Sequence, residues 1–149
     1  MGNSESSIKK VNFDDVIMIS KYSKESSKNK NILIHVMDKD DEELLIKNTL
    51  LINEEIEKIN SLLSLRKMDM TIVIYGKNTD NVSKVVRRYQ QLCDMGFSNV
   101  YVYLGGLFEW LLLQEIYGND EIQTNNICKR NILDYKPTRS LWNYLGFYN

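Results

Sequence analysis

The 149-residue sequence is short of the residues that usually reveal a specialised protein, having one histidine, one proline, two cysteines and no alanine. The cysteines, Cys93 and Cys128, form no C-x-x-C pair, so with a single histidine they do not predict a zinc site. A domain of this length buries enough apolar surface to be stable without disulfides or a metal. We therefore expect a reduced, cytoplasmic protein with no metal and no cofactor.

Charge and hydropathy argue against further classes of protein. Nineteen basic and twenty acidic residues leave a net charge of -1, which gives no electrostatic footprint for nucleic acid. The longest apolar run, around residues 111–113, is far shorter than the roughly 20 residues of a membrane helix. The N-terminus lacks the apolar core of a secretory signal. The abundance of Asn, Ile and Lys is typical of AT-rich genomes, such as those of protists or large DNA viruses.

The composition divides the chain into three parts. Residues 1–10 are polar and are predicted to form a flexible tail. Residues 11–118 are predicted to form one domain, in which the Ser-, Lys- and Asn-rich stretch 20–31 is a surface loop. Residues 119–149 form a C-terminal extension, expected to pack on the domain or on a partner.

Hydrophobic periodicity predicts an α/β domain. Five short apolar runs indicate strands at residues 16–19, 32–37, 49–52, 71–75 and 100–104. Apolar residues spaced three to four apart predict helices from residue 53, from 82 to 95 before a capping Gly96, and from 107 to 117. This alternation indicates a five-stranded, mainly parallel sheet with helices on both faces. The strand 71–75 should be central and buried on both sides.

The turn after the strand 71–75 is where a ligand is expected, because parallel sheets bind ligands beyond the carboxyl ends of their strands. This loop consists of Gly76, Lys77, Asn78, Thr79, Asp80 and Asn81. It contains no nucleophile. Two interpretations remain open: the loop binds a small anion weakly through its backbone N–H groups with help from Lys77, or it is a structural turn capped by Asp80 or Asn81.

The residues around this loop resemble a known family. The chain from residue 71 reads TIVIYGKNTDNVSKVVRRYQQLCDMGFSNVYVYLGGLFEW, and this passage resembles the second half of a rhodanese-like domain. The resemblance covers about residues 70–117 and includes Trp110, four residues after the second glycine of Gly105-Gly106. It implies that the glycines form a tight strand-to-helix turn and that the tryptophan fills the core.

The same resemblance implies a loop that cradles an anion and carries a catalytic cysteine and an arginine. Here Gly76 stands at the place of the cysteine, and Asn81 or Val82 at the place of the arginine. The upstream strand has His35 and Met37 where the family often has an aspartate and an arginine. The resemblance therefore implies a catalytically inactive member, with no catalytic residue.

Three other residues invite a functional interpretation. His35 lies in an apolar strand and is predicted to have a packing or hydrogen-bonding role. Cys93 lies on the apolar stripe of its helix and is predicted to be a small buried hydrophobe. Cys128, followed by Lys129 and Arg130, is either an exposed thiol with some acidity or an ordinary cysteine of the tail.

The C-terminal extension is rich in aromatic residues, which are seldom left in water. They either pack back on the domain or contact a partner chain, where Trp and Tyr are favoured. We expect Trp142 to be the energetic anchor in either case. The candidate contact residues are Tyr135, Trp142, Tyr144, Phe147 and Tyr148.

The N-terminus matches the pattern for N-myristoylation, in which Gly2 is acylated and Ser6 completes the motif. A single myristoyl chain gives only marginal membrane binding, so any membrane contact through Gly2 would be peripheral. The leading hypothesis is a non-catalytic module for protein binding or assembly, tethered to a membrane if Gly2 is acylated. The alternative is a small-anion binder, or an enzyme that uses the loop for other chemistry.

Overall fold

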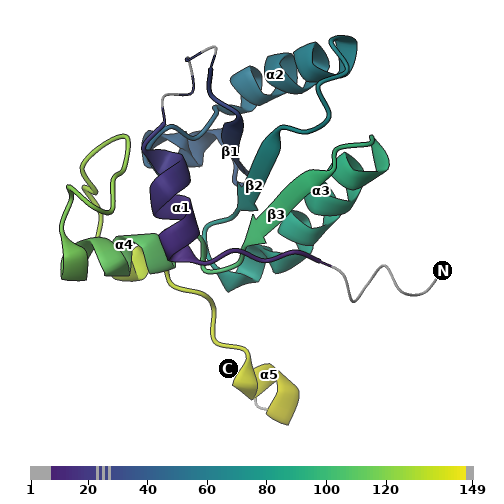
Figure 1. The fold of residues 1–149 in the computed structure, drawn as a ribbon. Helices are drawn as coiled ribbons and strands as arrows, with labels where there is room; N and C mark the ends of the chain where they lie inside the picture. The colour runs from purple at the N-terminus through teal and green to yellow at the C-terminus, as the bar shows by residue number, and fades with distance from the viewer. Residues whose placement is uncertain (1–7, 23, 25, 27, 147–149) are drawn as a thin grey trace.

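Helices and strands alternate along most of the chain (Figure 1), in a computed structural model that describes residues 8–22, 24, 26 and 28–146. The α-helices are α1 (Phe13–Ser20), α2 (Ile52–Ser64), α3 (Val82–Asp94), α4 (Gly106–Tyr117) and α5 (Leu141–Leu145). The strands are β1 (Asn31–His35), β2 (Thr71–Tyr75) and β3 (Asn99–Tyr103). Three short 3-10 helices are η2 (Lys39–Glu43), η3 (Thr79–Asn81) and η4 (Ile132–Tyr135).

The three strands form one parallel sheet in the order β1-β2-β3. Tyr75, the last residue of β2, pairs with His35 of β1 on one side and with Tyr103 of β3 on the other. The carboxyl ends of all three strands therefore meet at one edge of the sheet. Ligands of open parallel sheets bind at this edge.

Each face of the sheet is covered by its own pair of helices. One face carries Ile32, Ile72 and Val100 and packs against buried residues of α2 and α3. The opposite face carries Leu33, Val73 and Tyr103 and packs against α1 and α4 (Figure 1). Ile72, Val73 and Ile74 are all fully buried, which confirms that β2 is a central strand covered on both sides.

The strand expected at residues 16–19 is wrong, because this run belongs to helix α1. The apolar residues of the run suit a strand, yet the residues before them form a helix start. Asn12 accepts a hydrogen bond from the N–H of Asp15, and the Asp15 carboxylate accepts one from the N–H of Asn12. This reciprocal capping box fixes the first turn of the helix and outweighs the β-propensity of the residues that follow.

The described residues thus contain three strands instead of the expected five. The run 49–52 contributes a single parallel bridge between Thr49 and Leu33, and the chain enters α2 at Ile52. On the opposite edge Lys10 forms a similar single bridge to Val102. Short segments therefore flank the sheet on both sides without extending into strands.

The helices expected from periodicity are confirmed, with small shifts at their ends. α3 ends at Asp94, and Gly96 follows with φ +107°, a conformation that favours glycine. α4 begins at Gly106, where φ is +70° and an added Cβ would lie 2.6 Å from the carbonyl oxygen of Gly76. Glycine at this turn therefore lets the start of α4 approach the loop after β2.

The segment after α4 returns to the domain. The N–H of Lys47 donates to the carbonyl of Gln123, and the N–H of Asn125 donates to that of Leu45. The fully buried Trp110 donates from Nε1 to the Gln123 carbonyl at 2.9 Å, which confirms its expected core position. Ile122 and Tyr135 are also buried in the core beside α1 and α4.

Candidate functional site

The loop after β2 lies at the carboxyl edge of the sheet, between Tyr75 and the start of α3. Its second half forms the 3-10 helix η3, and Asn78 caps that helix by accepting a hydrogen bond from the N–H of Asp80 at 2.8 Å. The loop is joined to the start of α4 through two carbonyls. Gly76 and Lys77 accept hydrogen bonds from the N–H groups of Leu107 and Phe108, at 2.9 and 2.8 Å.

The side chain of Asn81 fills the inside of the loop. Its Oδ1 accepts a hydrogen bond from the N–H of Lys77 at 2.7 Å. The N–H of Asn81 itself donates to the carbonyl of Asn78 at 3.1 Å. An anion held by this loop would need free N–H groups, and three of them, those of Lys77, Asp80 and Asn81, are already bonded inside the loop.

Gly76 stands where the family resemblance places a catalytic cysteine, and the space beside it is taken. A Cβ added at Gly76 would lie 2.5 Å from the Cβ of Asn81 and 3.0 Å from its Oδ1. Any side chain at this position would therefore force the loop or Asn81 to move.

The C-terminal extension closes the loop from outside. Asn78, which is 7% exposed, donates from Nδ2 to the carbonyl of Tyr135 at 2.8 Å. Asp80 accepts two hydrogen bonds on Oδ2 from Thr138, one from the N–H and one from the hydroxyl, both at 2.9 Å. The sequence placed Asn78 in the loop but did not predict its partner Tyr135 or the role of Thr138, because a contact between residues some sixty positions apart leaves no local signal.

The charged groups around the loop are also engaged. Lys77, the expected helper in anion binding, places its Nζ 3.1 Å from Asp41 of η2. Asp80 keeps a carboxylate on the outer side of the loop, where it receives the bonds from Thr138. A small anion would thus meet a neutralised lysine and a nearby negative charge.

His35 has the hydrogen-bonding role expected of it. Its Nδ1 accepts a hydrogen bond from the N–H of Met37 at 3.0 Å, so the ring proton lies on Nε2, which donates to Glu42 at 2.8 Å. The same Glu42 oxygen accepts a hydrogen bond from the N–H of Ile52 at the start of α2. His35 and Glu42 therefore connect the end of β1 to a helix start.

Two buried tyrosines, Tyr75 and Tyr103, end β2 and β3 at the carboxyl edge of the sheet. Burial raises the pKa of Tyr75 well above the ordinary tyrosine range, although hydrogen bonds with Thr49 and the N–H of Ile46 oppose the shift. Burial also raises the pKa of Tyr103, and the nearby Glu109 adds to the effect. The Tyr103 hydroxyl finds no hydrogen-bond partner among the residues that the structure describes. Both phenols are neutral at physiological pH.

The two cysteines are free thiols, Cys93 on α3 and Cys128 in the C-terminal extension. Cys93 is exposed on α3, so the prediction that it is buried is wrong. Cys93 follows the buried Leu92 in the sequence, but it lies at the edge of the apolar stripe of α3 and its side chain is exposed. Cys128 is half-buried, and its Sγ lies 3.2 Å from the carbonyl of Arg130.

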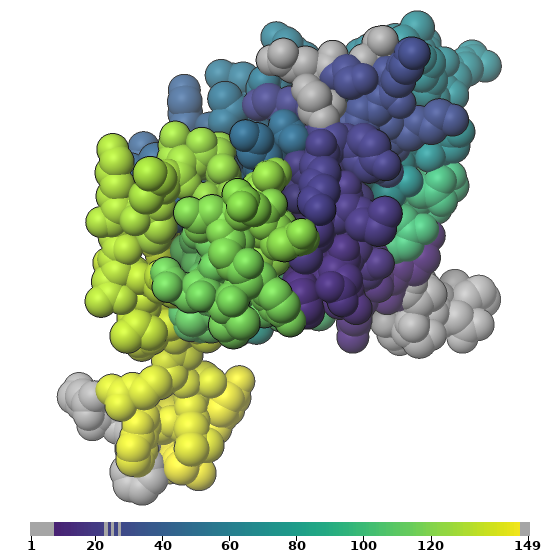
Figure 2. Space-filling view, turned by 60° about the vertical axis from the view of Figure 1, so that its left-hand side comes forward, coloured from purple at the N-terminus to yellow at the C-terminus, as the bar shows by residue number. Residues whose placement is uncertain are grey.

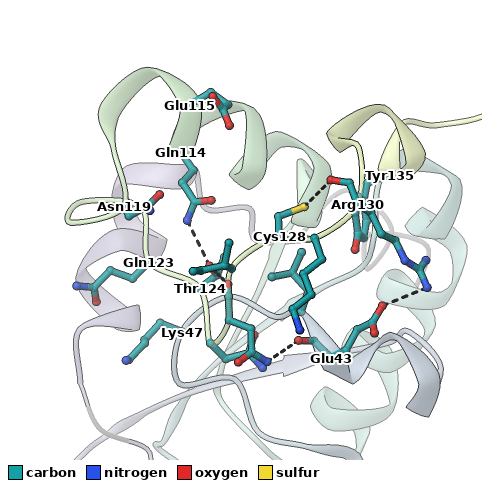
Figure 3. A pocket seen from close by; sticks show the side chains of 15 residues that line it. Glu43, Lys47, Gln114, Glu115, Asn119, Gln123, Thr124, Cys128, Arg130 and Tyr135 are labelled. Carbon is teal, nitrogen blue, oxygen red and sulfur yellow. Dashed lines mark hydrogen bonds and ion pairs between the residues drawn. The ribbon is translucent and has the colours of Figure 1, made fainter.

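Cys128 lines an open hollow of about 830 Å³ between α4, η2 and the extension (Figure 3). Its walls are largely polar. Two interactions connect the lining residues: Gln114 donates a hydrogen bond to Thr124, and Arg130 forms an ion pair with Glu43. No group of three or more His, Cys, Asp or Glu side chains in the described part of the chain could hold a metal ion.

The aromatic residues of the extension fall into two groups. Tyr135 is 5% exposed and packs in the core, whereas Trp142 and Tyr144 of α5 are 47% and 83% exposed. Trp142 therefore does not fill a core site of its own chain, and its role at an interface stays a prediction. Phe147, Tyr148 and Gly2 lie outside the described residues.

A parallel α/β sheet with a helix-flanked loop at its carboxyl edge is the architecture of the rhodanese-like class. The rhodanese-like domain family matches residues 18–113, and this chain belongs to that family. The match begins well upstream of residue 70, where the resemblance noted above begins, so it includes β1 and α2. A search of curated proteins finds no match. Within the residues described, no helix is long and apolar enough to cross a membrane.

Proposed function

We propose that this protein is a non-catalytic rhodanese-like module that acts by contact, in protein binding or assembly in the cytoplasm. The observation that carries the proposal is the loop after β2, which has glycine in place of the nucleophile. Its N–H groups at Lys77 and Asp80 are hydrogen-bonded to the side chains of Asn81 and Asn78. A thiolate is required for attack on sulfur or phosphate in the family's chemistry. No residue from Gly76 to Asn81 can supply one.

The C-terminal extension supports the second half of the proposal. It seals the loop through Tyr135 and Thr138 and then presents Trp142 and Tyr144 on the outside. Exposed aromatic residues of this kind are favoured as anchors of contact surfaces. The candidate contact residues Trp142, Tyr144, Phe147 and Tyr148 follow the buried Tyr135 in the sequence. Acylation of Gly2 would add a peripheral membrane tether to the opposite end of the chain.

The proposal is tested by assaying the full chain for sulfur transfer from thiosulfate and for phosphatase activity. We expect no turnover above that of denatured protein. Turnover that survives in the Cys93→Ser, Cys128→Ser double variant would overturn the proposal, because it would place a reaction where the structure offers no thiol.

Binding of an anion without catalysis is tested separately. Titration with sulfate or phosphate should leave the backbone amide resonances of residues 76–82 unchanged in NMR spectra, since Asn81 occupies the loop. Saturable shifts confined to these amides would instead favour the alternative of a small-anion binder.

A further inference from the structure

Helix α5 displays four large apolar or aromatic side chains to solvent. Leu141, Trp142, Tyr144 and Leu145 are 63%, 47%, 83% and 55% exposed. Figure 2 shows α5 standing off from the body of the protein at the end of a narrow neck. Four such side chains within a helix of five residues form a concentrated apolar surface outside the core.

The neck holds α5 in this position. Its residues 136–140 include Pro137, and Thr138 is fixed to Asp80 by two hydrogen bonds at 2.9 Å. Because the anchor lies only three residues before Leu141, the start of α5 lies within about 11 Å of it. Gly146, with φ +80°, ends the helix. All five residues of α5 are exposed in this arrangement.

A second copy of the chain is a poor occupant for this surface. A fully buried aromatic side chain covers about 150 to 250 Å², so the exposed parts of these four residues amount to a few hundred Å². A stable protein interface needs about 800 Å² from each partner. Pairing of α5 with α5 would fall well short of that area. The hollow beside Cys128 is largely polar and does not complement an apolar helix.

The charge of the segment favours a different occupant. Residues 135–149 contain Lys136 and Arg139 and no acidic residue, whereas the whole chain has a net charge of -1. Tryptophan and tyrosine prefer the boundary between water and hydrocarbon, where the ring is buried and its polar group stays hydrated. Each basic residue near an anionic bilayer adds about 1 kcal/mol of attraction. Leucine, aromatic and basic residues together match the chemistry of a lipid surface.

We propose that α5 is an interfacial anchor that inserts Trp142 and its apolar neighbours into the surface of a membrane containing anionic lipids. The inference rests on the proposed function in treating α5 as a contact surface, and it names a lipid surface instead of a protein as what α5 contacts. A single such anchor binds weakly and reversibly, and stable membrane attachment takes two signals. Acylation at Gly2 would supply the second signal. The body of the domain would stay free for a protein partner.

The experiment uses the full chain with Gly2 unmodified and vesicles of phosphatidylcholine with or without phosphatidylserine. Trp110 is fully buried, so a change in tryptophan emission on vesicle addition reports on Trp142. We expect a blue shift and co-sedimentation with the anionic vesicles that weaken as salt is added. The double variant Trp142→Ala, Leu145→Ala should bind these vesicles at least ~10-fold more weakly. The control Ile127→Ala, which removes an exposed apolar side chain outside α5, should bind like the wild type.

The inference is overturned if the wild type ignores anionic vesicles, or if the double variant binds them equally well. Association of the chain with itself that depends on Trp142, seen by analytical ultracentrifugation without lipid, would assign α5 to a second copy instead. These outcomes leave the proposed non-catalytic function standing. The non-catalytic part of that function is tested by the activity assays and the anion titration, which do not involve vesicles.

Discussion

The side chain of Asn81 takes the place inside the loop that a bound anion would need. Its Oδ1 accepts the N–H of Lys77, and its Cβ lies where a side chain at position 76 would begin. One residue thereby removes both a donor and the space for a nucleophile. The proposed lack of activity is thus supported by two features, the absence of a cysteine at position 76 and the position of the Asn81 side chain.

We expect the variant Gly76→Cys to be less stable than the wild type by about 1 to 3 kcal/mol, because the new Cβ would overlap Asn81. Asn81→Gly should also lower stability, since it leaves the N–H of Lys77 without its acceptor. Combined, the two changes should cost clearly less than their sum. Denaturant unfolding of the four proteins of the cycle measures this coupling. Strict additivity would show that Asn81 does not obstruct position 76.

Tyr75 and Tyr103 pair in the sheet and provide a matched comparison. Tyr75→Phe leaves the buried N–H of Ile46 without its acceptor, so the free energy of unfolding should fall by about 1 to 3 kcal/mol. Tyr103→Phe removes a hydroxyl that has no partner among the described residues and should be neutral or stabilising. Equal losses in urea unfolding of the two variants would contradict this assignment.

The same tyrosines predict a dependence on alkaline pH. Burial raises the pKa of Tyr75 in the folded state, so the unfolded chain loses this proton first as pH rises. Its contribution to stability is complete below the unfolded tyrosine pKa of about 10 and is lost progressively above it. Tyr103 acts in the same direction. Urea unfolding between about pH 9 and 11 should show a smaller decline in Tyr75→Phe than in the wild type.

Among the elements, the neck after η4 and the loop after β2 depend on each other. Asp80 provides the acceptor for both hydrogen bonds of Thr138, while Asn78 holds the carbonyl of Tyr135. The family resemblance implies an anion-binding loop at this position, and in this chain the loop is where the C-terminal extension attaches. This attachment determines where α5 stands.

Asp80→Ala should therefore release the neck while leaving the domain folded. Loss of the two exposed hydrogen bonds corresponds to about 1 kcal/mol, hence roughly fivefold faster amide hydrogen exchange at residues 136 and 138–140, Pro137 having no amide hydrogen. Asp134→Ala, which removes a carboxylate from η4 nearby, is the control and should exchange like the wild type. If neck exchange is unchanged in Asp80→Ala, the contact between loop and extension does not hold the neck.

For the molecule as a whole, the extension has a docked part and a displayed part. Tyr135 is 5% exposed in the core, so Tyr135→Ala should cost about 3 kcal/mol and lower the melting temperature. Trp142→Ala should change stability by less than about 0.5 kcal/mol, because α5 is not part of either core. Calorimetry of the two variants tests the division. A large loss in Trp142→Ala would mean that α5 packs on its own domain.

Local sequence pattern is sufficient to predict several elements of this fold. Periodicity and turn residues located β2, α3, β3 and α4 to within a few residues, and the missing cysteine at Gly76 was visible directly. Local pattern gave a wrong prediction where two signals competed. At residues 16–19 the apolar run favours a strand, whereas the capping box of Asn12 and Asp15 starts a helix, and the segment is helical. It also misplaced Cys93, because a residue at the edge of an apolar stripe can turn either way.

How the loop is filled and what covers it depend on contacts that form only in the folded chain. The bond from Asn78 to Tyr135 and those from Thr138 to Asp80 join residues more than fifty positions apart. No spacing or composition encodes such contacts, because they arise when the chain closes over the sheet edge. The same closure separates the aromatic residues of the extension, burying Tyr135 while holding Trp142 in solvent.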